Sequence, residues 1–120
     1  MERDEAFIKH IRDAIKNIEE YIQGIGKEEF LDEKNKMVRN AVVREFEIIG
    51  EATKRLSEEL KNLNPDLPWR DIEGMRNKLI HEYFGVDMAV VWKTIESDLP
   101  ILKKVVEKIS DSFIKYEKKI

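Results

Sequence analysis

The chain contains no cysteine in its 120 residues, which excludes a disulfide framework, zinc sites built on thiolates and thiol catalysis. Five glycines and three prolines are too few for the many turns of an all-β fold. No apolar run approaches the roughly 18 residues that a membrane helix needs, so we expect no membrane association. The net charge of −3 argues against a generally basic nucleic-acid-binding protein.

Apolar residues make up 42% of the sequence and charged residues 39%, a balance that favours a globular chain over a disordered one. A chain of this length predicts one domain, spanning residues 1–120. Its opening, "MERDEAFIKH", is charged from the second residue and lacks the apolar core of a secretory signal. We therefore expect a cytoplasmic protein.

Apolar residues recur at steps of three and four along most of the chain, which is the pattern of amphipathic helices. We predict one helix over residues 4–23, ended by the glycines of "GIG", and a second from about residues 31–33 to 60, with Asp32 as its candidate cap. The inner face predicted for the second helix consists of Met37, Ala41, Val42, Ile48, Ile49, Ala52, Leu56 and Leu60.

A loop with two prolines, "NLNPDLP", separates these helices from a third, short helix that begins near Trp69 and ends near residues 83–84. Asp87 is the candidate cap of a fourth helix, in which Pro100 predicts a kink or a break. Four to five antiparallel helices joined by short loops predict an all-α, up-and-down helical bundle.

The short helix carries the stretch "MRNKLIHEYFG", which places Arg76, Asn77, His81 and Tyr83 within eight residues of one another. At 100° per residue, these four side chains fit a sector of about 160° on the helix surface. The spacing thus presents a cation, an amide, an imidazole and a phenol to one partner surface.

Such a set suits the cleavage of an RNA phosphodiester. His81 can take the proton of a 2′-hydroxyl, because the ordinary pKa of histidine lies near neutrality. Arg76 can hold the phosphate through its planar fork, Asn77 can orient the histidine or donate to the phosphate, and Tyr83 can position a base or a phosphate. A single histidine without a converging acidic set makes a poor metal site, so we expect no metal and no cofactor.

Spacing alone leaves a structural alternative open, in which Arg76 pairs with Glu73 while His81 and Tyr83 pack at a helix interface. The other histidine, His10, is expected to be solvated on the first helix. Trp69 and Trp92 lie among apolar neighbours and are predicted to anchor the core or an interface.

The stretch "RNKLIHEYFGVD" resembles the Arg-x4-His-x-Tyr signature of the HEPN superfamily, and the chain is similar more narrowly to the HepT-like toxin family. Three segments carry the resemblance in the family's order, over about residues 4–110: "REFEIIGEATKRLS", "PWRDIEGMRNKLIHEYFGVD" and "VVWKTIESDLPILKKVV".

The resemblance implies a HEPN-type bundle that forms a symmetric homodimer, with the motif helices of two subunits facing each other across a cleft. It implies a metal-independent ribonuclease toxin that acts on RNA, including tRNA, with Arg76 and His81 as the catalytic pair and Asn77 assisting. It also implies an antitoxin partner, a minimal nucleotidyltransferase of the MntA type, that silences the toxin by transferring AMP to Tyr83.

The charge near the motif is balanced, because residues 69–84 carry three cations and three carboxylates. Arg39, Arg44 and the lysines of residues 101–120 are candidates for additional positive charge, although those lysines also fit a solvated helix end. Two other functions stay open: a non-catalytic subunit that binds a nucleotide or a nucleotidyltransferase, and a helical dimer with a polar interface.

Overall fold

The computed structural model describes residues 2–74 and 87–119. These ranges contain helices and no strand, which confirms the all-α prediction. The elements, in chain order, are α1 (Glu2–Tyr21), α2 (Lys27–Leu31), a 3-10 helix (Glu33–Asn35), α3 (Lys36–Lys54), α4 (Glu58–Leu63), a helical stretch at residues 69–74, α6 (Met88–Ser97) and α7 (Leu99–Lys119).

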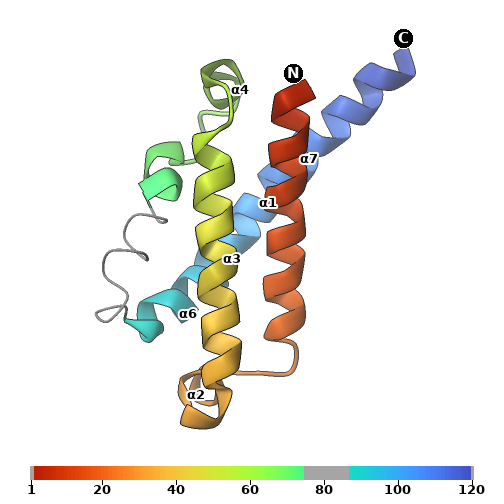
Figure 1. Ribbon diagram of the computed structural model, residues 1–120. Helices are drawn as coiled ribbons and strands as arrows, with labels where there is room; N and C mark the ends of the chain where they lie inside the picture. The colour runs from red at the N-terminus through yellow and green to blue at the C-terminus, as the bar shows by residue number, and fades with distance from the viewer. Residues whose placement is uncertain (1, 75–86, 120) are drawn as a thin grey trace.

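Two long helices, α1 and α3, run antiparallel beside each other, and α7 crosses behind them (Figure 1). The buried face of α1 is formed by Ile8, Ile11, Ala14, Ile15 and Ile18, each at most 2% exposed. These five residues belong to the apolar stripe that the spacing predicts for residues 4–23, whereas Tyr21 of the same stripe is 38% exposed. Burying a large aliphatic side chain contributes about 1.5–3 kcal/mol, so these isoleucines favour the packing of α1 in the bundle.

The turn after α1 depends on Gly24, whose φ of 75° lies in the left-handed region that side chains disfavour. The chain then forms the five-residue helix α2, which is too short to be recognised from periodicity. Its Phe30 is fully buried, and the Phe30 ring packs against the Trp92 ring of α6 with centroids 5.1 Å apart. The sequence correctly predicted the first helix and its end before the glycines of "GIG", but it did not predict α2.

The long second helix predicted for residues 31–60 is wrong, because the structure divides it into three elements. Asp32 caps the 3-10 helix through the Lys34 amide at 3.0 Å rather than capping α3. At the other end, α3 stops at Lys54 and Ser57 begins α4 by accepting a hydrogen bond from the Leu60 amide at 3.1 Å. Ser57 is in turn held by Asp4 of α1, which the local pattern could not indicate.

The predicted inner face of this segment is only partly correct. Met37 is 85% exposed and Ile48 is 36% exposed, whereas Val43 and Phe46 are buried. Met37 and Ile48 lie about half a helical turn from the stripe that packs on α1. Other predicted residues are buried as expected: Val42, Ile49, Ala52, Leu56 and Leu60.

The predicted break near Pro100 is confirmed, because α6 ends at Ser97 and α7 begins at Leu99. Pro100 occupies the first turn of α7, where a missing N–H costs no intrahelical hydrogen bond. Asp87 caps α6 as predicted, accepting from the Ala89 amide at 2.9 Å. No helix in the described ranges has the length and apolar character needed to cross a membrane.

Candidate functional site

The predicted site residues Arg76, Asn77, His81 and Tyr83 lie outside the described residues, which stop at Gly74 and resume at Asp87. The predicted helix end near residues 83–84 falls in the same gap. The structure therefore shows how the bundle holds the two ends of this segment.

The N-terminal anchor is the helical stretch at residues 69–74. Trp69 and Ile72 are each 8% exposed and belong to the hydrophobic core. The Trp69 indole Nε1 donates a hydrogen bond to the Asn64 carbonyl at 2.8 Å, and the Ile72 amide donates to the Pro68 carbonyl at 3.1 Å. These contacts fix both the position and the direction of the helix that leads into the motif, and they confirm Trp69 as a core anchor.

An ion pair reinforces this anchor. Lys61 of α4 has a side chain that is only 7% exposed, and its Nζ donates to the Glu73 carboxylate. A second carboxylate, that of Glu58, lies 3.8 Å from the same Nζ. Glu73 is thus engaged by Lys61, while the alternative partner considered from sequence, Arg76, lies outside the described residues.

The C-terminal anchor is α6. Its capped start at Asp87 follows the gap directly, and Val91, Trp92 and Ile95 are buried. Trp92 is therefore a core residue, as predicted. Within the described part of the chain its indole Nε1 has no hydrogen-bond partner. Both ends of the segment 75–86 are consequently attached to buried residues of one bundle.

The cations expected to supplement the motif are differently placed. Arg39 is 9% exposed, and its guanidinium donates to the carbonyls of Phe30 and Asp32. It therefore holds α2 against α3 and is not available to a ligand, which corrects its proposed contribution. Arg44 is exposed on α3, and Lys103 of α7 forms an ion pair with Glu19 at 2.9 Å.

The other histidine, His10, is exposed on α1 as predicted, with its ring edge-on to Phe7 at 5.8 Å between centroids. Among the described residues there is no group of three or more His, Cys, Asp or Glu side chains that could hold a metal ion. The cationic side chains described in this part of the chain are exposed or are members of ion pairs.

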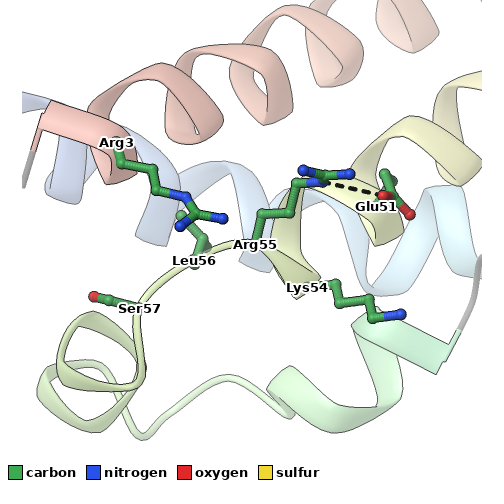
Figure 2. A pocket seen from close by; sticks show the side chains of 6 residues that line it. All are labelled: Arg3, Glu51, Lys54, Arg55, Leu56 and Ser57. Carbon is green, nitrogen blue, oxygen red and sulfur yellow. Dashed lines mark hydrogen bonds and ion pairs between the residues drawn. The ribbon is translucent and has the colours of Figure 1, made fainter.

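The sequence reasoning missed one cationic feature. A pocket of about 420 Å³ is lined by Arg3, Glu51, Lys54, Arg55, Leu56 and Ser57 (Figure 2). The pair Lys54–Arg55 at the end of α3 was visible in the sequence, but nothing local indicated that Arg3 of α1 would join it.

Comparison with known families matches residues 11–109 to the family described as "Ribonuclease HepT-like". A Thermococcus cleftensis protein named "Probable ribonuclease HepT" is 47% identical over 103 residues, covering 86% of this chain and 92% of that protein.

Two further relatives are named as candidate RNases. One, from Caldanaerobacter subterraneus, is 40% identical over 109 residues, covering 91% of this chain and 96% of the relative. The other, from Methanocaldococcus jannaschii, is 40% identical over 102 residues, covering 85% and 92%. No solved structure gives a match. By the extent of the family match and the identity to these relatives, the chain belongs to the HepT-like ribonuclease family.

Proposed function

We propose that this chain is the toxin component of a HEPN–nucleotidyltransferase toxin–antitoxin pair and acts as a metal-independent RNA endonuclease, with tRNA a candidate substrate. The observation that carries the proposal is an intact Arg76-x4-His81-x-Tyr83 motif in a chain of the HepT-like family. The two buried anchors on either side of residues 75–86 support it, since a reacting constellation needs a rigid base.

In the proposed reaction, His81 removes the proton of a ribose 2′-hydroxyl, and the resulting oxyanion attacks the adjacent phosphorus. The bond to the 5′-oxygen breaks, and that oxygen takes up a proton to become a 5′-hydroxyl. Arg76 stabilises the negative charge that builds on the phosphoryl oxygens, and Asn77 assists. The other product carries a 2′,3′-cyclic phosphate or its hydrolysed form.

The proposal includes a homodimer in which two motif segments face each other. An apolar groove of about 310 Å³ supports it, lying between α3, residues 67–72 and the junction of α6 with α7. Its lining includes Ile101, which is 55% exposed. Exposed aliphatic surface beside the anchor of the motif is a reasonable contact for a second copy. Light scattering at micromolar concentration should give twice the 14.2 kDa subunit mass, and a monomer would count against the shared cleft.

The decisive experiment is cleavage of end-labelled tRNA in EDTA by protein that mass spectrometry has shown to be unmodified at Tyr83. We expect His81→Ala to lower cleavage at least ~10²-fold, the usual contribution of one acid–base group. His10→Ala is the matched control, because His10 is an exposed histidine of α1.

Equal cleavage by wild type and His81→Ala would overturn the proposed role of His81. Absence of cleavage by the unmodified wild type on a panel of RNAs would favour the non-catalytic subunit that binds a nucleotide or a nucleotidyltransferase.

A further inference from the structure

The cationic pocket lies where three elements meet: the first turn of α1, the end of α3 and the turn into α4. Arg3 reaches it from α1, while Lys54 and Arg55 come from the end of α3 (Figure 2). Three cations therefore share its lining with a single carboxylate, that of Glu51. The excess of positive charge makes an anion the natural occupant.

An aromatic ring helps to hold the two guanidinium groups in place. The Cζ atoms of Arg3 and Arg55 each lie 5.9 Å from the centroid of the Phe7 ring. Both distances are within the range in which the ring face attracts a cation. Phe7 therefore keeps two planar groups near each other before any ligand arrives, although their charges repel.

The nearby acids do not neutralise the pocket. Glu51 forms an ion pair with the Arg55 Nε at 3.1 Å. Asp4, just beside the pocket, accepts from the Ser57 amide at 2.8 Å and from the Ser57 hydroxyl at 2.6 Å. In the described part of the chain, neither Arg3 nor Lys54 has a carboxylate partner. Among the described residues, no carboxylate therefore competes with a ligand for these two charges.

The chemistry favours a phosphate among possible anions. A guanidinium presents its N–H donors in a fork that matches two phosphate oxygens, and an ammonium adds a mobile point charge. Because a guanidinium keeps its charge throughout the physiological range of pH, the pocket stays positive. A group with several anionic oxygens can accept hydrogen bonds from more than one of these side chains at once.

The pocket also lies close to the anchor of the motif. Ser57 lines it, and the next residue, Glu58, lines a second cavity of about 370 Å³ that contains Trp69, Arg70 and Glu73. Glu73 immediately precedes Gly74, where the described residues stop before the motif. The two cavities therefore have consecutive residues, Ser57 and Glu58, in their linings at the start of α4.

We propose that the pocket formed by Arg3, Lys54 and Arg55 binds a phosphate group, supplied by the backbone of the RNA substrate or by a free nucleotide. The assignment of the phosphate to an RNA backbone rests on the proposed ribonuclease function. The affinity of the pocket for a phosphate group does not depend on that function. As an RNA site, it contributes binding and register away from the cleaved bond.

The test compares two doubly substituted proteins that lose the same charge. Arg3→Gln/Lys54→Gln removes two pocket cations and keeps Arg55, which forms the ion pair with Glu51. Lys16→Gln/Lys36→Gln removes two exposed lysines outside the pocket. Thermal melts of both variants first establish that they fold as the wild type does.

Binding is then measured by fluorescence anisotropy with a labelled, fully 2′-O-methylated RNA strand, which keeps every phosphate but has no free 2′-hydroxyl to cleave. A titration across salt concentrations gives the slope of log affinity against log salt. This slope is negative, and loss of one phosphate contact reduces its magnitude by about 0.7 on a single strand. We expect this fall in the pocket variant, with weaker binding on all sequences, and little change in the control.

Free phosphate is tested by the thermal shift that inorganic phosphate or AMP produces at constant ionic strength, since a ligand of the folded state raises Tm. A shift lost only in the pocket variant, with RNA binding unaffected, supports the phosphate site and identifies the free nucleotide as its source. Equal effects of the two variants in both assays, or no effect in either, would overturn the proposal.

Cleavage of unmethylated RNA by the same proteins separates this inference from the proposed function. Cleavage by the wild type, together with RNA binding and a phosphate-induced thermal shift that are both independent of the pocket residues, refutes the phosphate site and leaves the ribonuclease intact. Pocket-dependent binding without any cleavage supports the phosphate site and removes the proposed activity.

Discussion

Lys61 and Glu73 form an ion pair that joins α4 to the helix leading into the motif, and the two side chains differ in exposure. The Lys61 side chain is 7% exposed and that of Glu73 is 29% exposed. Removing Glu73 leaves the charge of Lys61 without this partner at a buried position, whereas removing Lys61 leaves the charge of Glu73 at a position that water can reach. A charge that has lost its partner costs more free energy where it is less hydrated.

We expect Glu73→Met to lower the free energy of unfolding by about 1 to 3 kcal/mol, because it leaves a buried ammonium with Glu58 as its remaining carboxylate. Lys61→Met should cost less, since Glu73 can be hydrated and the lysine stem is replaced by apolar atoms. Urea denaturation of both variants checks this order, with Lys16→Met as the exposed control. The reverse order would contradict the assignment of Lys61 as the less hydrated partner.

Asp4 and Ser57 form a second long-range contact, which holds the residue that caps the start of α4. The Asp4 carboxylate is 3% exposed and accepts both the amide and the hydroxyl of Ser57. Asp4→Ala leaves these two donors without their acceptor, so we expect a loss of about 1 to 3 kcal/mol in the free energy of unfolding. Glu5→Ala, at an exposed neighbouring position, should change little, and equal losses in the two variants would show that the contact is unimportant.

Periodicity predicted the first helix, because its buried face repeats regularly and glycine follows it. It failed at residues 55–57, where the apolar spacing continues but the helix stops. "SEEL", with a serine before two glutamates, is a local signal for a new helix start. The contact that reinforces this start comes from Asp4, 53 residues away in the chain, and no local pattern reveals it.

The candidate site divides in the same way. Residue spacing and family resemblance single out Arg76, Asn77, His81 and Tyr83, and their roles stay predictions. The cationic pocket could not be predicted from the sequence, because the packing of α1 on α3 is what brings Arg3 near the pair Lys54–Arg55. Arg39 looked available in the sequence and is instead used to bond two backbone carbonyls.

Lys103 offers a prediction about pH. Its hydrogen bond and ion pair with Glu19 raise the pKa of Lys103 above the ordinary 10.5. A pKa raised on folding means that the stabilisation is fully present below 10.5 and is lost as the pH rises through the higher pKa of the folded state.

We therefore expect Lys103→Gln to lower Tm slightly at neutral pH, with the difference from wild type disappearing well above pH 10.5. Thermal melts across this range make the comparison, and Lys104→Gln at the exposed neighbouring position is the control. A difference that persists unchanged in strong alkali would rule out the ion pair as its cause.

The proposed role of Arg76 predicts a graded response to substitution. Arg76→Ala should lower the cleavage rate by about 10²-fold or more, as loss of one group that stabilises the transition state does. Arg76→Lys should recover only part of this loss, because an ammonium keeps the charge without the planar fork. Single-turnover cleavage in EDTA measures both, with Arg70→Ala as a control at an exposed arginine.

Comparable losses in Arg76→Ala and Arg70→Ala would indicate a general loss of attraction for RNA. That result would argue against a specific role for Arg76 at the reacting phosphate.

The proposed silencing of the toxin predicts that one tyrosine accepts AMP. In that transfer the Tyr83 phenolic oxygen attacks the α-phosphorus of ATP and pyrophosphate leaves. Incubation with a cognate minimal nucleotidyltransferase and ATP should add the mass of AMP to the wild type and stop its cleavage of RNA. Tyr83→Phe should keep its mass and its cleavage, because phenylalanine lacks the accepting oxygen.

Tyr21→Phe is the matched control. Tyr21 lies at the end of α1 and is 38% exposed, so its phenol is accessible to the transferase in the wild-type protein. Tyr21→Phe should be modified and silenced like the wild type. Modification of Tyr83→Phe would place the AMP on another residue, whereas modification that leaves cleavage intact would separate the transfer from silencing.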